Sequence, residues 1–476
     1  MVAALDSHFI AGRWQPSDGE TRIPAVDPST EDRFADVACG SATDVDRAVR
    51  AAQVAFAEYS TTTVEARVSL LEAIADGFER HRDEICAAIT QEMGVPVAAA
   101  FNVHFNSGPA HFRETAKALS TFRYEEPSGT TMVTNEPIGV CGLVTPWNFP
   151  VNQLACKIAP ALGAGCTVVL KPSECAAGSA SIIADVLHEA GVPEGAFNLV
   201  HGDGALTGTA LCAHPDVDMI SFTGSTRAGI EISRNAATTV KRVTLELGGK
   251  SPNIILDDAD LADAVAKGAA RCFNNSGQSC IAPARMLVPR NMLSRAEQIA
   301  AESAAKAQAG SAYNPQATIG PLANRAQYDK VCAYISIGVE EGARLIAGGA
   351  EQPEGVDRGY VVPATVFSDV EPGMRIAQEE IFGPVLCLIP YDDEADAIRI
   401  ANGTPYGLAA FVQGREIERV RRVARAIRAG IVQINYPPVD RGAPFGGYKH
   451  SGNGREWGVH GLREYFEVKS MIGFGT

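Results

Sequence analysis

Short apolar runs alternate with helical segments from about residue 139 onward, and this alternation limits the possible folds of the chain. Five runs are predicted to be strands, at 139–144, 166–170, 197–200, 218–222 and 243–247. Helical patches lie around 152–163, 176–190, 204–213 and 226–236. Strand–helix alternation of this kind predicts a parallel sheet with helices on both faces.

A second alternating set follows the first. Its predicted strands are 253–256, 285–289, 385–390, 409–412 and 430–435. A chain of 476 residues has room for two or three domains, so we expect a second α/β domain that begins near Gly248-Gly249. Residues 64–93 have a helical period that places six apolar side chains on one face for packing: Val68, Leu71, Ala75, Phe78, Ile85 and Ile89.

Composition excludes several classes of function. The net charge of −15 argues against nucleic acid and anionic membranes as partners. The eleven cysteines form no CxxC pair and the start of the chain has no basic signal region, so we expect reduced thiols in a cytoplasmic protein. No apolar run approaches the ~18 residues of a membrane span, and the nine histidines form no HExxH motif, so we expect no metal site.

Cys280 and Glu246 are the strongest candidates for chemistry. Cys280 ends the run NSGQSC (275–280), and Glu246 begins ELGGK (246–250). A thiolate attacks carbonyl carbon, and the resulting thioester is released by water that a carboxylate activates. A lone cysteine is more often a small buried apolar residue, so the surrounding motifs decide between these interpretations.

Those motifs are PWNFP (146–150), KPSE (171–174), FTGS (222–225), EEIFGP (379–384) and PFGGYKHSGNGRE (444–456). With them, the chain resembles the NAD(P)-dependent aldehyde dehydrogenases from about Phe9 to about Met471. The resemblance implies a Rossmann-type NAD-binding domain at 1–120 and 138–248 and a catalytic domain at 249–447. It also implies a small β extension at 121–137 and 463–476 that joins the subunits of a homodimer or homotetramer, because an apolar edge strand invites pairing.

The resemblance implies NAD as the cofactor. Lys171 and Glu174 would bind the adenosine ribose, and the charge of Glu174 would repel a 2′-phosphate and so favour NAD over NADP. Phe222 to Ser225 end a strand and open a helix, whose N-terminus suits a pyrophosphate. The expected cofactor-binding residues are Thr145, Pro146, Trp147, Lys171, Ser173, Glu174, Gly204, Phe222, Gly224, Ser225, Leu247, Gly248, Glu380 and Phe382.

Each of these motifs also has an ordinary structural interpretation. FTGS alone fits a common strand-to-helix turn, and Lys171 with Glu174 fits a solvated surface pair. The run GDGALTG (202–208) is better interpreted as a plain glycine turn than as a nucleotide-binding loop. Phe382 alone would be a core residue.

For catalysis, the resemblance implies that Cys280 attacks the aldehyde. The side-chain amide of Asn148 and the backbone N–H of Cys280 would stabilise the oxyanion. Glu246 would then activate the water that hydrolyses the thioester, and Lys157 and Glu456 would relay the proton. Relatives that transfer the acyl group to coenzyme A generally lack this base, so Glu246 favours release of a free acid.

The same resemblance places nine residues around the aldehyde: Phe149, Asn152, Gln153, Cys156, Asn274, Ser279, Ile281, Val439 and Phe445. Many relatives have aromatic residues at the positions of Cys156, Asn274 and Val439. The smaller side chains here predict a wider tunnel, suited either to a bulky, partly polar aldehyde or to many aldehydes.

Three alternatives remain beside an NAD-dependent, hydrolytic aldehyde dehydrogenase. An acylating semialdehyde dehydrogenase would require coenzyme A. A hydrolase would use Cys280 and Glu246 on esters, with NAD incidental. A crystallin-like protein would keep the fold without the chemistry, although such proteins usually lose the nucleophile or the base, and both are present here.

Overall fold

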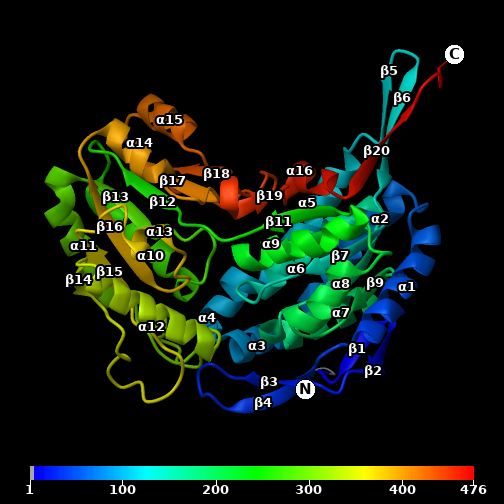
Figure 1. Cartoon of the computed structure of the whole chain (residues 1–476), viewed down its shortest axis with the longest axis horizontal. Coiled ribbons are helices and arrows are strands. Elements are labelled where there is room, and N and C mark those ends of the chain that lie inside the picture. Colours follow the sequence, from blue (N-terminus) through cyan, green and yellow to red (C-terminus); the bar gives the residue numbers. More distant parts are fainter. Residues whose placement is uncertain (1–4, 476) are drawn as a thin grey trace.

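The computed structural model describes residues 5–475, so residues 1–4 and 476 of the expected domains lie outside the described part. Two large sheets lie side by side, each covered by helices (Figure 1). The first sheet has eight strands in the order β19-β11-β10-β7-β8-β9-β1-β2. Their bounds are β19 (Gly452–Asn453), β11 (Arg242–Glu246), β10 (Met219–Thr223), β7 (Val140–Val144), β8 (Thr167–Lys171), β9 (Phe197–Leu199), β1 (Ser7–Ile10) and β2 (Arg13–Pro16).

The order of the parallel strands creates a switch point. The chain runs outward from β7 through β8 to β9, then crosses to the other side of β7 to form β10 and β11. The connections that leave β7 and β10 therefore run in opposite directions from the carboxyl ends of these two strands. In open α/β sheets this is where ligands bind.

Two apolar clusters cover the two faces of the first sheet. One packs the buried Phe78, Phe112 and Leu162 against β7 and β8, and the other packs Val45 and Leu211 against the opposite face. The helices around this sheet are α1 (Ala42–Tyr59), α2 (Val64–Arg80), α3 (Arg82–Met93), α4 (Val97–Ala99), α5 (Ser107–Ser120), α6 (Pro150–Ala164), α7 (Ala177–Glu189), α8 (Thr209–Ala213) and α9 (Thr226–Ala236).

The helical period of 64–93 is divided between two helices. The α2 helix ends and α3 begins at His81, whose backbone leaves the helical conformation at φ −104° and ψ 12°. The His81 ring lies within hydrogen-bond distance of Glu84 and Glu189, and these contacts fix the corner. Five of the six predicted face residues are buried, and Val68 is half-buried.

The second sheet has seven strands in the order β14-β15-β16-β13-β12-β17-β18, all parallel except β14. Their bounds are β14 (Arg344–Ala347), β15 (Thr365–Ser368), β16 (Val385–Tyr391), β13 (Arg285–Pro289), β12 (Pro252–Ile255), β17 (Ala409–Gln413) and β18 (Ile431–Ile434). Its helices are α10 (Leu261–Phe273), α11 (Leu293–Lys306), α12 (Arg325–Glu340), α13 (Arg375–Gln378), α14 (Glu394–Asn402) and α15 (Ile417–Ala426).

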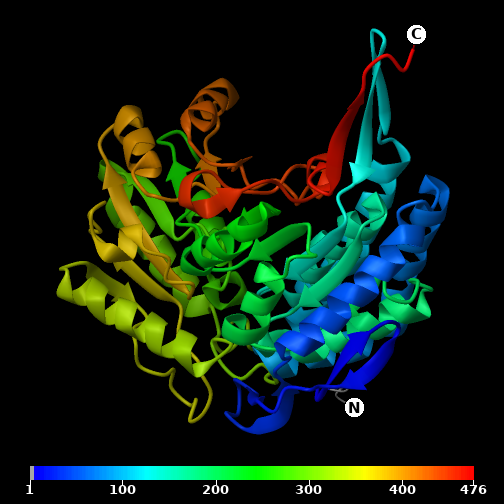
Figure 2. The same ribbon diagram turned by 45° about the vertical axis from the view of Figure 1, so that its right-hand side comes forward.

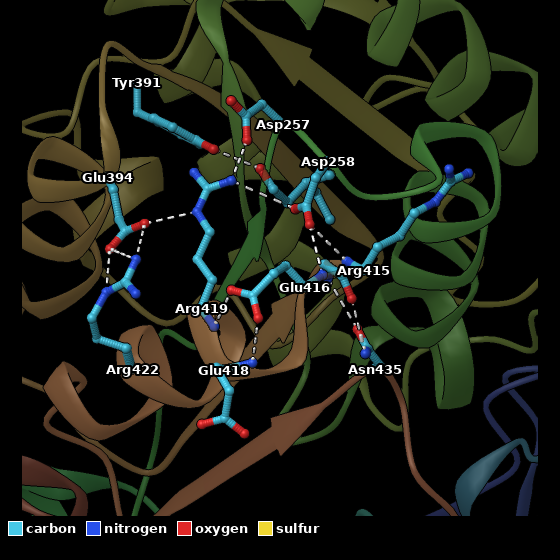
Figure 3. Close-up of polar contacts among 12 residues, drawn as sticks. Asp257, Asp258, Tyr391, Glu394, Arg415, Glu416, Glu418, Arg419, Arg422 and Asn435 are labelled. Carbon is cyan, nitrogen blue, oxygen red and sulfur yellow. Dashed lines mark hydrogen bonds and ion pairs between the residues drawn. The ribbon is translucent and has the colours of Figure 1, made fainter.

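A network of ion pairs fixes α15 to the second sheet (Figure 3). Arg419 Nε donates to Glu394 at 2.9 Å, and its Nη1 donates to Asp257 at 2.5 Å. The Glu416 carboxylate caps the helix by accepting from the backbone N–H groups of Glu418 and Arg419. Because a cap satisfies free N–H groups at the helix start, α15 begins at a defined position.

A small third sheet projects from the molecule together with the C-terminal segment (Figures 1 and 2). It consists of β20 (Phe466–Met471), β6 (Thr131–Pro137) and β5 (Glu125–Ser128), in that order. The strands are antiparallel, with Val468 opposite Asn135. Residues 125–137 and 466–471 thus meet in one sheet. A separate hairpin joins β3 (Arg22–Val26) to β4 (Arg33–Ala38).

The α/β fold class is confirmed, and the ten predicted strands are all present. Within residues 5–475, no helix combines the length and apolar character needed to cross a bilayer. The strands that went unpredicted include the short antiparallel edge strands β2 and β14, which have four residues each and are only partly buried.

Candidate active site

Cys280 lies in a cavity of about 500 Å³ that residues around both large sheets line. It follows a tight turn at Asn274–Gly277 with left-handed backbone at Asn275 (φ 53°), Ser276 (φ 57°) and Gly277 (φ 70°). A Cβ on Gly277 would lie 2.0 Å from the Gly383 carbonyl oxygen. Sparsely populated backbone of this kind persists only where the surroundings enforce it, and it is frequent at functional sites.

The surroundings of Cys280 keep its sulfur protonated. The residue is partly exposed to the cavity, yet burial raises the pKa of the thiol well above its usual range. The carboxyl groups of Glu380, Glu246 and Glu456 raise this pKa further. Without a bound cofactor Cys280 is therefore a thiol at neutral pH, and its attack on a carbonyl requires a proton acceptor.

Asn148 provides a donor beside the nucleophile. Its side chain is buried, and Nδ2 donates to the Gln278 carbonyl oxygen at 3.1 Å. Asn275 Nδ2 donates to the Asn148 carbonyl oxygen at 2.8 Å, which fixes the loop before α6 to the Cys280 turn. An amide nitrogen carries two hydrogens, so one N–H of Asn148 remains for a developing oxyanion.

Glu246 ends β11 and is 4% exposed. Neither carboxyl oxygen has a hydrogen-bond partner among the described residues. Burial raises the pKa of Glu246 well above its usual range, and the Glu456 carboxylate raises it further, while Lys157 and Arg455 lower it. A carboxyl group with a raised pKa and no fixed partner suits a general base that holds water.

Glu456 and Lys157 form a buried ion pair. Lys157 Nζ also donates to Ser221 Oγ at 3.0 Å, and Cys156 Sγ donates to Glu456 Oε2 at 3.4 Å. Glu456 lines the Cys280 cavity, whereas Cys156 lies behind Glu456 and outside the lining. The Cys156 thiol points to this ion pair, one turn of α6 beyond Asn152 and Gln153, and its expected place beside the aldehyde stays a prediction.

The other expected pocket residues line the cavity: Phe149, Asn152, Gln153, Asn274, Ser279, Ile281, Val439 and Phe445. Ten lining residues were absent from the prediction, and they include Arg271, Arg441 and Trp457. Only the last has a sequence signal, since it directly follows Glu456 in the final motif. The arginines lie outside every quoted motif.

A second group of expected residues lies at the carboxyl edge of the first sheet. Lys171 ends β8 and is buried, and its Nζ donates to the Gly202 carbonyl oxygen at 2.8 Å. Lys171 is therefore not part of a solvated surface pair. Glu174 is half-buried, and Ser173 Oγ donates to its carboxylate at 3.4 Å.

The switch point between β7 and β10 carries unsatisfied hydroxyl groups. The Oγ1 atoms of Thr145 and Thr223 are buried without a hydrogen-bond partner among the described residues. Ser225 caps α9, and a Cβ on Gly224 would lie 2.4 Å from the Phe222 ring. Free hydroxyls beside a helix N-terminus suit the pyrophosphate of a dinucleotide. Thr223 adds a hydroxyl donor that was not among the predicted residues.

The expected glycine turn at 202–208 differs in detail from a plain turn. Gly204–Gly208 forms a π-helical turn that the Asp203 side chain caps by accepting from Leu206 N at 2.7 Å. A Cβ on Gly204 would meet no atom within 4 Å, so this face of the turn is open.

The remaining expected cofactor residues converge near Glu380. Glu380 Oε1 accepts from the Gly249 N–H at 3.0 Å, and a Cβ on Gly248 would lie 2.4 Å from Glu380 Oε2. Phe382 has left-handed backbone at φ 61°, and its ring meets Trp147 edge-to-face with centroids 5.5 Å apart. Pro146 is half-buried beside Trp147, and Leu247 is buried behind Gly248. Segments far apart in sequence thus meet around Glu380 and Trp147.

No group of three or more His, Cys, Asp or Glu side chains in residues 5–475 is arranged to hold a metal ion. The fold and the site are those of an α/β oxidoreductase with a cysteine in its cavity. A model of the aldehyde dehydrogenase family matches residues 14–471. The chain therefore belongs to the aldehyde dehydrogenase family and is an enzyme that oxidises aldehydes.

Individual relatives are similar over nearly their full length. A 3-succinoylsemialdehyde-pyridine dehydrogenase from a Pseudomonas species is 50% identical over 98% of each chain. A mutant of aldehyde dehydrogenase C from Pseudomonas syringae, solved with NAD+ and octanal, is 50% identical, with a TM-score of 0.98 over 99% of this chain and 97% of that one. A Staphylococcus aureus betaine aldehyde dehydrogenase with NAD+ is 34% identical, with a TM-score of 0.94 over 99% and 95% of the two chains.

Proposed function

We propose that this enzyme converts an aldehyde to the free carboxylic acid, with NAD as hydride acceptor and water as second substrate. The observation that carries the proposal is Glu246. It is buried beside the Cys280 cavity, and both of its oxygens are without partners in the described structure. A carboxyl group left unsatisfied in this way is costly unless a water or a reacting group uses it.

The first half of the reaction uses Cys280 and Asn148. The thiol of Cys280 gives its proton to a base as the sulfur attacks the aldehyde carbon. The free N–H of Asn148 and the backbone N–H of Cys280 stabilise the oxyanion of the thiohemiacetal. Bound NAD would be the hydride acceptor, and the residues around Thr145, Lys171 and Glu380 would hold it. The product of this half is a thioester on Cys280.

The second half uses Glu246 as general base. Its carboxylate removes a proton from water as the water attacks the thioester, and the acid and the Cys280 thiol are released. Glu456, paired with Lys157, lies near enough to raise the pKa of Glu246. This proximity supports the proposal that the pair receives the proton and passes it on.

Product analysis tests this proposal. The purified enzyme, incubated with NAD and an aldehyde, should form acid in the absence of coenzyme A. Glu246→Gln should lower turnover by about 10²–10⁴-fold while one equivalent of NADH still forms as a burst. The control is Glu302→Gln, at an exposed position on α11. A strict requirement for coenzyme A would instead identify an acylating enzyme.

We propose a preference for NAD over NADP because of Glu174. Its half-buried carboxylate, held by Ser173, follows Lys171 at the edge where a ribose would lie. A 2′-phosphate would bring a second negative charge to this place. Glu174→Gln should therefore raise kcat/KM for NADP more than for NAD. An unchanged ratio would assign the preference to another residue.

We also propose that the division near Gly248-Gly249 separates a cofactor domain from a catalytic domain, and that the third sheet joins subunits. Edge strand β20 exposes Val468 (67%), and Ile472 (86%) and Phe474 (60%) follow it. Exposed apolar side chains beside an unpaired strand edge favour pairing with another copy. Light scattering should show a homodimer or homotetramer, and Val468→Glu should shift it toward monomer.

A further inference from the structure

Arg441 lines the Cys280 cavity without a partner. It lies in the segment between β18 and β19, two residues after Val439, whose 68% exposure places it where the cavity opens. Its Nε is buried with no hydrogen-bond partner, and no other described residue accepts from its guanidinium or pairs with it. A buried guanidinium donor without an acceptor is unfavourable unless a ligand supplies one.

Arg271 provides a second cation in the wall of the same cavity. Its guanidinium lies 4.8 Å from the centre of the Tyr436 ring and donates to Gln433 Oε1 at 2.9 Å. Neither Arg271 nor Arg441 has a carboxylate partner within residues 5–475. The one carboxylate among the lining residues is Glu456, and Lys157 already pairs with it. This wall is therefore positive, although the whole chain carries a net charge of −15.

Asn152 adds a neutral donor to this wall. Burial lowers the pKa of His111 to about 4, so its ring is neutral, and Nε2 donates to Asn152 Oδ1 at 2.8 Å. This contact fixes the amide so that its oxygen faces His111 and its NH₂ group remains for the cavity. The donors of Asn152 and Arg441 thus have the same requirement, namely an acceptor on the substrate.

We propose that the enzyme prefers aldehydes with a carboxylate at the end remote from the reacting carbon, and that Arg441 is the residue that binds this carboxylate. This inference rests on the proposed aldehyde oxidation and specifies its substrate class. A guanidinium matches a carboxylate with two parallel hydrogen bonds, and the semi-enclosed position excludes part of the competing water. Arg441 is a specificity residue and takes no part in the chemical steps.

The kinetic test compares three aldehydes of equal chain length: an ω-oxo carboxylic acid, its methyl ester and the plain alkanal. Each is assayed with NAD across a series of lengths. The acid should have the highest kcat/KM, and Arg441→Gln should lower the ratio of acid to alkanal by about 10- to 100-fold. Arg441→Lys keeps the positive charge but lacks the two parallel N–H donors of a guanidinium. The ratio of acid to alkanal should therefore fall, but by less than in Arg441→Gln. Arg290→Gln, at an exposed arginine paired with Asp392, is the matched control and should keep it.

Binding provides a readout that is independent of turnover. Calorimetry with Cys280→Ala should detect the ω-oxo acid, and Cys280→Ala/Arg441→Gln should bind it about 10-fold or more weakly. Equal kcat/KM for acid and methyl ester in the parent enzyme would overturn the proposal, as would a loss in Arg441→Gln that is the same for all three aldehydes. Absence of NADH formation from every aldehyde would instead refute the proposed oxidation, and the calorimetry would still test Arg441.

Discussion

The carboxyl groups of Glu246 and Glu456 share one buried environment, and in the described structure only Glu456 is paired. Lys157 holds Glu456, whereas both oxygens of Glu246 are without partners. The nearby Glu456 carboxylate raises the pKa of Glu246 beyond the effect of burial alone. One carboxyl group is thus fixed in an ion pair, and the other has no partner and a raised pKa.

Turnover should therefore rise with pH through the raised pKa of Glu246. A protonated Glu246 cannot accept a proton from water, and the fraction of carboxylate grows as the pH rises through its raised pKa. When thioester hydrolysis limits the rate, kcat should rise with pH, and the midpoint of this rise should lie well above the usual pKa of a glutamate. Steady-state assays in overlapping buffers measure this. A profile already flat at pH 6 would contradict the assignment.

Two substitutions in the ion pair should shift this limb in opposite directions. Lys157→Met removes a positive charge that lowers the pKa of Glu246, so the midpoint should move to higher pH. Glu456→Gln removes a negative charge that raises the pKa of Glu246, so the midpoint should move to lower pH. Each change leaves a buried charge unpaired and should cost about 3–5 kcal/mol of stability. Equal shifts in the same direction would mean that structural loosening dominates.

The sequence allowed the parallel strands to be located because they are buried on both faces. β7, β8 and β10 are buried throughout and form continuous apolar runs, which were predicted to within one residue. β2 and β14 lie at sheet edges with exposed residues, so neither alternation nor a continuous apolar run distinguishes them from loops. The break between α2 and α3 at His81 was also not predicted, because side-chain contacts, including one to the distant Glu189, fix that corner.

The candidate site was predictable only where motifs carried it. The NSGQSC and PWNFP segments meet through Asn148, Asn275 and Gln278, as expected from their shared role in the resembled family. Arg441 could not be found in this way, since no periodicity or spacing marks a side chain whose distinguishing property is a missing partner. The contact between Cys156 and Glu456 could not be predicted either, because it joins segments 300 residues apart.

Gly277→Ala should reduce both stability and activity. The residue has φ +70°, and the new Cβ would lie 2.0 Å from the Gly383 carbonyl oxygen, so the turn that presents Cys280 must move. Gly355→Ala is the matched control, because Gly355 has φ +80° and open space around it. The control should lose about 1 kcal/mol from left-handed backbone alone. Gly277→Ala should lose more, with a lower kcat/KM, as measured by urea unfolding and NADH formation. Equal losses would place the whole effect in the backbone conformation.

Arg285 should be among the most sensitive positions for stability. It is fully buried and donates to three carbonyl oxygens, those of Lys250, Ile400 and Ala401, each at 2.9 Å. Burial lowers its pKa to about 10, so it stays charged at neutral pH. Ile400 and Ala401 lie in the last turn of α14, where carbonyl groups have no partners within the helix.

Arg285→Met keeps most of the apolar volume and removes all three donors, which leaves buried carbonyls unsatisfied. We expect a loss of about 3–5 kcal/mol and a lower melting temperature. Arg290→Met removes an exposed arginine whose ion pair with Asp392 is solvated, and it should leave the melting temperature almost unchanged. Similar melting temperatures for the two variants would show that the carbonyl groups find other donors, such as water that enters beside α14.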